Sequence, residues 1–254
     1  MNELNKDIIL KDLPTNRLNL HIYDEIDSTN DEAKRIEGIE DFHIFIAEKQ
    51  TKGRGRYGKK WSSPNSGNIY MTISTSQNTS QISPISLISG LICKKAIDKF
   101  IKTPSIMLKW PNDVLINGKK IAGILLEVAD FNVEEPSVIV GIGINISRAP
   151  ENIEYPVSRI NDYKTGHISV DDVLISLLQH FVYWFHIWED FGFGAIKDEW
   201  MRLAFKLDGS VSVETKNGVM AEYKFRGIDM EGAMLLDDEN GNRSRLRAGK
   251  VRFL

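Results

Sequence analysis

The stretch Gly53-Arg54-Gly55-Arg56-Tyr57-Gly58-Lys59-Lys60-Trp61 decides how this sequence is expected to fold. Its glycines let the backbone turn its N–H groups into a concave surface, and its guanidinium groups add paired donors that suit a carboxylate or a phosphate. Apolar runs from Phe42 to Ala47 and from Ile69 to Ser74 flank it, each with the pattern of a strand. The stretch is therefore predicted to be a mobile anion-binding loop that bridges two neighbouring strands.

Two known phosphate-binding patterns match this loop by spacing alone. Its three glycines spell G-x-G-x-x-G, and Gly53 to Lys60 spells G-x-x-x-x-G-K without the final hydroxyl residue. Both patterns need a helix after the loop, because the helix N-terminus holds the phosphate. Residues 62–68 instead read SSPNSGN, which favours a turn. A Rossmann loop and a P-loop are therefore disfavoured, and a basic surface loop without a ligand stays as an alternative.

The composition describes a folded, soluble protein whose positive charge is local. The 254 residues, 42% of them hydrophobic, are enough for one large α/β domain and a small accessory module. A net charge of −3 predicts no general attraction to nucleic acid or acidic membranes. No apolar run approaches the roughly 18 residues of a membrane span, and the first residues form no signal peptide. The single cysteine, Cys93, excludes an intrachain disulfide, fits a reducing cytoplasm, and is expected to be a buried thiol inside a helix.

The pattern of apolar residues predicts an α+β fold, with a mixed or antiparallel sheet flanked by helices. Residues 1–17 form an N-terminal extension and residues 18–206 the main domain. After residue 206 the sequence changes to short alternating runs broken by turn dipeptides, which predicts a small barrel of four or five strands over residues 207–254. Helices are expected from Ser83 to about Ile101, from Asp171 through Trp188, and from about Ala195 to Ala204.

Polar side chains follow the first predicted strand, Leu18 to Tyr23. Asp27-Ser28-Thr29-Asn30 supplies hydroxyl groups that can cap a short helix, and acidic residues follow in its first turn. Capping explains at least one of Ser28 and Thr29. The same small side chains at a strand-to-helix corner can also bind a ligand, and both interpretations stay open.

A predicted hairpin carries a second polar cluster. Lys109-Trp110-Pro111-Asn112-Asp113 precedes one strand, and the Asn117-Gly118 turn leads to the next. Alternation along a strand places Lys120 on one face and Lys119 on the other, so that one lysine can point into a site. The alternative is that Asn112 and Asp113 merely begin the hairpin and both lysines are solvated.

Glycines alternate in a later strand, Gly141-Ile142-Gly143-Ile144-Asn145. Glycine weakens a strand, so two on one face suggest that a ligand approaches closely, or else that a helix packs tightly there. The sequence offers no covalent nucleophile beside a base, no metal-type Cys/His spacing, and five histidines that do not cluster. Such a set suits joining a carboxylate to a nucleotide phosphate, where charge is neutralised and reactants are positioned.

In these motifs the sequence resembles the biotin–protein ligase family, also called biotin–[acetyl-CoA-carboxylase] ligases. The resemblance runs from about residue 20 to the C-terminus and implies a class II synthetase-like catalytic domain with an SH3-like barrel. The segment ahead of Leu18 is too short for the DNA-binding domain that some members carry. The motifs, in the family's order, are Asp27-Ser28-Thr29-Asn30, Gln50 with Gly53-Arg54-Gly55-Arg56 and Trp61, Lys109-Trp110-Pro111-Asn112-Asp113, Lys120-Ile121-Ala122-Gly123-Ile124 and Gly141-Ile142-Gly143-Ile144-Asn145.

The resemblance implies that biotin and ATP, with Mg²⁺, form biotinyl-5′-AMP, and that a lysine of a biotin carboxyl carrier protein then takes the biotin. It implies three catalytic residues: Lys120 at the carboxylate and α-phosphate, Arg56 retaining the intermediate, and Asp113 orienting the incoming lysine. It implies no DNA and no membrane partner, a cytoplasmic protein, and a homodimer as one oligomeric state. The resemblance also implies the binding residues. The ureido ring of biotin would be held by Ser28, Thr29, Gln50 and the backbone of Gly53, Arg54, Gly55 and Arg56, while Gly141 and Gly143 would leave room for biotin. Asn112 and Asn145 would lie near the nucleotide, and Asn30, Trp61 and Gly123 would belong to the same site.

Two features limit the resemblance or compete with it. The family often has a basic residue where Tyr57 stands, which puts the loop's phosphate contacts in doubt. A lipoate- or octanoate-attaching enzyme of the same fold is the nearest rival, and a nucleic-acid-binding module that uses the basic and aromatic residues of the loop is a rival of another class.

Overall fold

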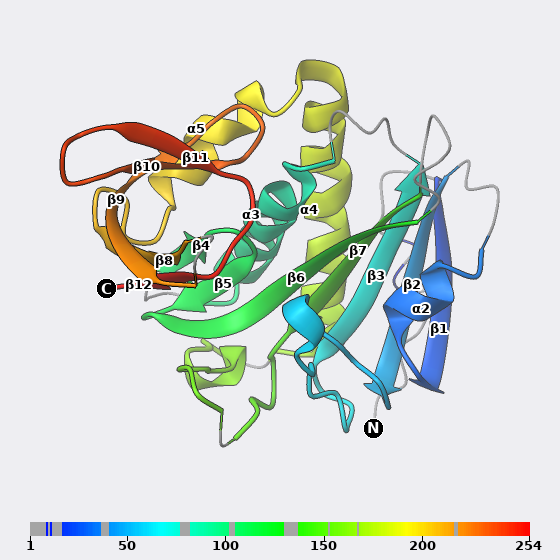
Figure 1. Ribbon diagram of the computed structural model, residues 1–254. Coiled ribbons are helices and arrows are strands. Elements are labelled where there is room, and N and C mark those ends of the chain that lie inside the picture. Colours follow the sequence, from blue (N-terminus) through cyan, green and yellow to red (C-terminus); the bar gives the residue numbers. More distant parts are fainter. Residues whose placement is uncertain are drawn as a thin grey trace.

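The computed structural model describes residues 9, 11, 17–36, 41–76, 82–101, 105–129, 137–151, 153–166, 168–215 and 218–254 of the chain. This described part contains two β-sheets, the α-helices α2 to α5 and two 3₁₀ turns. The larger sheet forms the middle of the molecule, and the smaller sheet lies at one end of it (Figure 1). The predicted N-terminal extension, residues 1–17, falls almost wholly outside the described residues.

The larger sheet has seven strands in the order β1-β2-β3-β7-β6-β5-β4. Only β1 and β2 pair in parallel, and the other described neighbours in this sheet are antiparallel. The expected mixed sheet is confirmed. Its strands are β1 (Leu18–Ile26), β2 (Phe42–Gln50), β3 (Ile69–Ser76), β4 (Ile106–Lys109), β5 (Asp113–Ile116), β6 (Lys119–Ala129) and β7 (Ser137–Ile144).

Helices cover both faces of this sheet. On one face α3 (Ile85–Asp98) packs over the strands with α4 (Val170–Phe191) beside it, and α2 (Thr29–Ala33) lies on the other face (Figure 1). Apolar side chains meet in a core between the sheet, α3 and α4, where Phe42 packs edge-on against Phe181. A capping box begins α4, because the Ser169 hydroxyl accepts from the Asp172 N–H while the Asp172 carboxylate accepts from the Ser169 N–H.

The second sheet confirms the small C-terminal β-module. Its five antiparallel strands have the order β11-β10-β9-β8-β12, and they follow α5 (Gly194–Arg202). Gly232 and Gly241 lie in turns with φ of 76° and 81°, in the left-handed region that glycine adopts readily. The strands are β8 (Ser210–Glu214), β9 (Met220–Ile228), β10 (Met234–Asp237), β11 (Arg243–Leu246) and β12 (Val251–Phe253).

The two sheets are connected at the strand that leads into the Lys109–Asp113 motif. The Leu108 N–H donates to the Leu203 carbonyl at 2.8 Å, and the Phe205 N–H donates to the Leu108 carbonyl at 2.8 Å. The buried Trp110 indole donates to the Gly232 carbonyl at 3.0 Å. The C-terminal module is thereby held beside the motif that sequence reasoning assigned to the nucleotide.

Candidate active site

The Gly53–Trp61 loop connects β2 to β3, which pair in antiparallel fashion. A single 3₁₀ turn, Arg56–Gly58, forms its tip, and Tyr57 and Gly58 adopt left-handed φ angles of 56° and 69°. The loop returns on itself, since the Trp61 N–H donates to the Gly53 carbonyl at 3.0 Å. No α-helix follows it before β3, so the prediction of a strand-to-strand loop is confirmed and the Rossmann and P-loop patterns are excluded.

A cavity of about 510 Å³ lies beneath this loop. Most of the predicted site residues line it, although they come from five separate parts of the chain. Gly53 and Asn145 are not among the lining residues. The predicted residues that do line it are Ser28, Thr29, Asn30, Gln50, Arg54, Gly55, Arg56, Trp61, Asn112, Asp113, Lys120, Gly123, Gly141 and Gly143.

Asn145 is buried and used by the backbone around it. Its side-chain amide donates to the Ser158 carbonyl at 3.1 Å, and its N–H donates to the Ile121 carbonyl at 2.8 Å. These bonds tie the end of β7 to the segment behind Lys120. The expected place of Asn145 near the nucleotide or magnesium therefore stays a prediction.

Positive charge dominates the cavity although the whole chain carries a net charge of −3. Asp113 is the one carboxylate among the lining residues, all of which the structure describes. Lys250 and Arg252 come from the C-terminal module, far along the sequence, where no local pattern marked them. The basic lining residues are Arg54, Arg56, Lys59, Lys60, Lys109, Lys120, Lys250 and Arg252.

Lys120 projects from β6 into the cavity among these basic side chains. Its Nζ lies 2.6 Å from Asp113 Oδ1, and its ammonium lies 5.3 Å from the centre of the Trp61 ring. The contact with Asp113 is ionic rather than a well-directed hydrogen bond, because Oδ1, although buried, accepts none of good geometry from the described residues. A β-bulge between Val114 and Leu115 shifts the register here, and Lys119, the preceding residue of the same strand, is exposed and does not line the cavity. The predicted separation of the two lysines is thus confirmed.

Lys109 lies half-buried at the same end of the cavity. Burial lowers the pKa of its ammonium group, Asp113 opposes that shift, and Lys120 adds to it. The ammonium lies 5.5 Å from the centre of the Phe253 ring in β12. A cation that is only partly hydrated is well suited to pair with an incoming phosphate.

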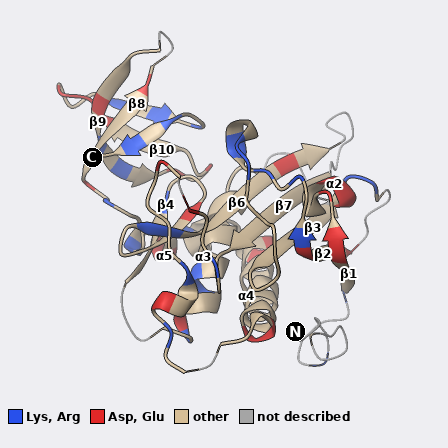
Figure 2. Ribbon diagram, turned by 90° about the horizontal axis from the view of Figure 1, so that it is seen from below, with Lys and Arg blue, Asp and Glu red and all other residues tan. Residues whose placement is uncertain are grey.

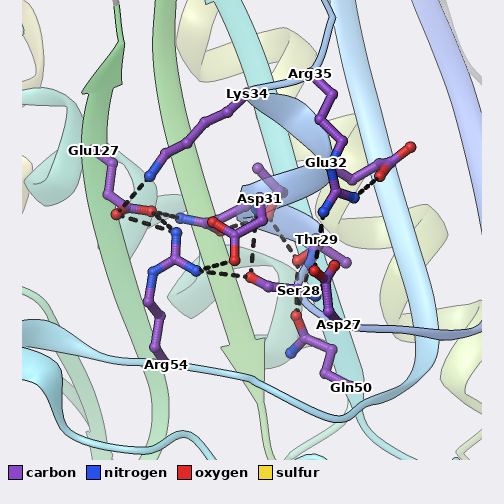
Figure 3. Close-up of polar contacts among 12 residues, drawn as sticks. Asp27, Ser28, Thr29, Asp31, Glu32, Lys34, Arg35, Gln50, Arg54 and Glu127 are labelled. Carbon is purple, nitrogen blue, oxygen red and sulfur yellow. Dashed lines mark hydrogen bonds and ion pairs between the residues drawn. The ribbon is translucent and has the colours of Figure 1, made fainter.

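The two loop arginines face different ways. Arg56 donates to Asn112 Oδ1 at 3.3 Å, which carries the tip of the loop across the cavity to the Lys109–Asp113 motif. Arg54 instead pairs with Asp31 at 2.6 Å and with Glu127 at 3.0 Å (Figure 3). In this structure Arg54 attaches the start of the loop to α2 and β6, and only Arg56 reaches toward the predicted phosphate side.

Uncharged hydrogen-bonding groups line the opposite end of the cavity. Ser28 and Thr29 are 2% and 3% exposed, and both belong to the N-terminus of α2. The Ser28 hydroxyl caps the helix by accepting from the Asp31 N–H, which confirms the capping interpretation. Gln50 Oε1 accepts from the Thr29 N–H at 2.9 Å, and Gln50 Nε2 donates to Ser63 Oγ at 3.0 Å. The capping residues therefore also face the cavity, as the second interpretation proposed.

The glycines of β6 and β7 allow side chains to lie flat on the sheet. A Cβ at Gly143 would come within 2.4 Å of the Trp61 indole, and one at Gly141 would come within 2.3 Å of the Asn30 amide. In this structure the space above these glycines holds Trp61 and a residue of α2. Close packing against a helix, one of the two alternatives for this strand, is what Gly141 shows.

Among the residues that the structure describes, no group of three or more His, Cys, Asp or Glu side chains could hold a metal ion, and no helix is long and apolar enough to span a membrane. Cys93 is buried in α3, and burial raises the pKa of its thiol to about 12, which confirms the expected structural thiol.

Comparisons with known proteins agree with this geometry. Residues 23–145 match the family model described as "Biotin/lipoate A/B protein ligase family", and residues 93–202 match a second model of that description. The biotin–[acetyl-CoA-carboxylase] ligase of Paracoccus denitrificans is 32% identical over 246 residues, which cover 89% of this chain and 97% of that protein. The bifunctional ligase/repressor BirA of Bacillus subtilis is 32% identical over 78% of this chain, which spans only 62% of that relative's length.

Solved structures show the same architecture. A biotin protein ligase from Aquifex aeolicus in complex with biotin and ATP has a TM-score of 0.77 and 27% identity, over 93% of this chain and 99% of that one. A biotin protein ligase from Leishmania major in complex with biotinyl-5-AMP has a TM-score of 0.63 and 26% identity, over 91% and 99% of the two chains. The similarity extends across both sheets.

Proposed function

This chain belongs to the biotin/lipoate A/B protein ligase family, and from that premise we propose that it attaches biotin to a lysine of a biotin carboxyl carrier protein at the expense of ATP. In the first step a carboxylate oxygen of biotin attacks the α-phosphorus of ATP, and pyrophosphate leaves. In the second step the lysine nitrogen attacks the acyl carbon, AMP leaves, and the amine loses a proton. Mg²⁺ bound to ATP would neutralise part of the charge on its phosphates.

The observation that carries this proposal is the polarity of the cavity. Thr29 and Gln50 offer neutral hydrogen-bonding groups at one end. Eight basic side chains line the cavity with a single carboxylate, and among them Arg54 lies near Ser28, whereas Lys109 and Lys120 lie near Asp113 at the other end. A ligand that joins a neutral cyclic urea to a carboxylate, with a triphosphate beside it, matches both ends. Relatives whose structures contain biotin and ATP support the same assignment.

Lys120 and Asp113 are the residues proposed to act at the reacting atoms. Lys120 would stabilise the charge that builds on the carboxylate and α-phosphate, since its ammonium points into the cavity. Asp113 Oδ1 is buried and accepts no well-directed hydrogen bond from any described residue. Once phosphate draws Lys120 away, this oxygen is free to accept a proton from the incoming lysine amine and orient it.

The loop is proposed to be a lid that keeps water from the mixed anhydride. Arg54 holds its start against α2 and β6, and Arg56 holds its tip against Asn112. A lid attached at both places would close over the adenylate and open for the carrier protein. Tyr57 lies at the exposed tip, where its ring packs against the Arg56 guanidinium.

The rival functions differ in what they predict. A lipoate ligase would bind an acyl chain without a urea, for which the polar groups around Thr29 have no use. A nucleic-acid-binding module would need unpaired cations in the loop, but Arg54 is paired with Asp31 and Glu127. On the C-terminal strands, too, positive and negative side chains lie together (Figure 2). There Arg243 pairs with Asp237, and Arg247 pairs with Glu231.

Biotin-dependent exchange of labelled pyrophosphate into ATP tests the proposed function directly. We expect exchange with biotin and none with lipoate, followed by transfer of labelled biotin to a carrier domain. Transfer of lipoate alone, or salt-sensitive DNA affinity without any exchange, would contradict the proposal. The proposal also includes a domain boundary near residue 206, a cytoplasmic location and the absence of operator binding. It further includes a homodimer as the oligomeric state, which sedimentation with and without ligand tests.

A further inference from the structure

Glu127 in β6 is the starting point of a directed chain of hydrogen bonds that ends in the cavity. Its carboxylate accepts from Asn30 Nδ2 at 2.7 Å. It also accepts from Lys34 Nζ at 3.1 Å and from Arg54 Nη2 at 3.0 Å (Figure 3). Burial alone would raise the pKa of Glu127, but these three donors outweigh burial and hold the pKa below its ordinary value. Glu127 is therefore an ionised group that can only accept hydrogen bonds.

This carboxylate fixes the orientation of the Asn30 amide. The NH₂ group of Asn30 must face Glu127, because the other end of the amide, Oδ1, has no proton to give. Oδ1 then faces Thr72 Oγ1 at a distance of 2.6 Å. Since Oδ1 only accepts, the Thr72 hydroxyl must donate to it.

The direction passes from Thr72 to Thr29. Thr72 is fully buried, and its single hydroxyl proton is already given to Asn30. Thr72 Oγ1 also lies 2.8 Å from Thr29 Oγ1, so in that contact Thr72 accepts and Thr29 donates. Gln50 Oε1 is an alternative acceptor for the Thr29 hydroxyl, but it is farther away, at 3.2 Å from Thr29 Oγ1. It already accepts from the Thr29 N–H at 2.9 Å.

The hydroxyl proton of Thr29 is therefore donated to a hydrogen bond within the protein. Thr29 lines the cavity, and its hydroxyl oxygen offers lone pairs only. A ligand atom placed against it must therefore be a donor such as a ring N–H. A ligand that offers a carbonyl or another acceptor at this point would meet a second acceptor and bind poorly.

We propose that Glu127, which does not line the cavity, is a specificity-determining residue: through Asn30 and Thr72 it makes Thr29 an acceptor for a ureido N–H of biotin. The inference rests on the proposed function, since it takes biotin as the ligand. It adds Glu127, which acts through Asn30 and Thr72. It also explains why the ion pair of Glu127 with Arg54 lies behind the neutral groups of the cavity wall.

The test is calorimetric titration of biotin, without ATP, into the wild-type chain and three variants. Glu127→Gln keeps the shape but adds a donor, so that the Asn30 amide can reverse and the chain loses its direction. Thr72→Val removes the middle of the chain. Lys34→Gln removes a cation from the same carboxylate without changing any donor in the chain, and it is the matched control.

We expect Glu127→Gln and Thr72→Val each to raise the Kd of biotin by about tenfold, the size of one hydrogen bond to a ligand, and Lys34→Gln to leave it within about twofold. The double variant should lose little more than either single variant, because both break one chain. An unchanged Kd in Glu127→Gln, or fully additive losses in the double variant, would overturn the inference.

Biotins methylated on one ureido nitrogen separate this role from general damage to the fold. In the wild-type chain, methylating the nitrogen that faces Thr29 should weaken binding strongly. In Glu127→Gln the ratio of the Kd of this methylated biotin to the Kd of biotin should be smaller than in the wild-type chain, because Thr29 is no longer held as an acceptor. Equal loss of affinity for biotin and for both methylated biotins in Glu127→Gln would show a merely structural effect and overturn the inference.

Failure of the inference and failure of the proposed function give different results. Absence of biotin binding by the wild-type chain would overturn the proposed function as well. Normal pyrophosphate exchange by the wild-type chain, with the biotin Kd unchanged in the variants, would overturn the inference alone.

Discussion

Lys120 Nζ and Asp113 Oδ1 lie 2.6 Å apart at the centre of a cavity whose other charged lining residues are all basic. In the absence of ligand, Asp113 is thus the internal counter-charge of Lys120. With the roles proposed above, a phosphate that enters the cavity would compete for the same ammonium group. Binding of the first substrate would then be coupled to release of Asp113 for the second step.

Replacing Lys120 should therefore impair the first step most. We expect Lys120→Ala to slow biotin-dependent pyrophosphate exchange on the order of 10²–10³-fold, as for other groups that stabilise developing charge. Carrier binding should change little, because only 15% of the Lys120 side chain is exposed. Lys119→Ala is the matched control, since Lys119 precedes Lys120 in the same strand, is exposed and does not line the cavity. Normal exchange in Lys120→Ala would refute the role.

Arg56 should retain the adenylate rather than form it. Because Arg56 joins the tip of the lid to Asn112, Arg56→Gly should let biotinyl-adenylate escape and label lysines of bystander proteins. The measurement is biotin transfer to serum albumin in the presence of carrier, compared with Lys52→Ala, a loss of charge at an exposed position beside the loop. Labelling that stays confined to the carrier in Arg56→Gly would count against the assignment.

Glu199 provides a pH-dependent contribution to stability. It links α5 to Lys95 of α3, and the hydrogen bonds from Lys95 and Arg202 lower the pKa of its carboxyl group from 4.5 to about 2. A lowered pKa stabilises the fold above the unfolded-state value, and this stabilisation is lost as pH falls toward the folded-state value. Glu199→Gln should thus cost about 1 kcal/mol of unfolding free energy at neutral pH.

Urea unfolding at neutral pH and at steps down to about pH 2 measures the difference between the two proteins. It should stay constant above about pH 4.5 and shrink below it. Asp198→Asn is the control, because Asp198 is exposed on the same helix and the described residues show no ion pair to it. A pH-independent difference for Glu199→Gln would contradict the linkage.

Sequence alone predicted the parts of the site that depend on local chemistry. The absence of a helix after Gly58 placed the loop between two strands, and alternation along the strand after the Asn117-Gly118 turn placed Lys120, but not Lys119, on the cavity wall. Both follow from turn propensity and strand alternation, which are properties of adjacent residues.

Other parts depend on which distant segments meet, and the sequence could not reveal them. The pairing of Arg54 with Glu127 needs the loop to lie beside β6, and the contribution of Lys250 and Arg252 needs the C-terminal module to pack against the hairpin. A guanidinium in a glycine-rich loop looks equally suited to phosphate and to carboxylate. Only the neighbours in space decide between them.

Gly143 offers a test of how the close packing in β7 serves the site. A Cβ at this position would lie 2.4 Å from the Trp61 ring, so Gly143→Ala must displace the indole from the cavity wall. Overpacking of this kind costs about 1–3 kcal/mol, and because a side chain rather than backbone gives way, we expect the fold to persist while the KM for biotin rises about tenfold or more.

Gly90→Ala is the matched control for Gly143→Ala. Gly90 is buried in α3, but there a Cβ would meet only Leu108 and Ile124 at 3.7 and 3.9 Å, ordinary contact distances. Alanine should therefore leave the kinetics unchanged and stabilise the helix by about 0.4–1 kcal/mol. The comparison is decided by steady-state exchange with biotin varied at saturating ATP. If Gly143→Ala keeps the wild-type KM, the indole is free to move aside, and Trp61 is then no fixed part of the biotin-binding wall.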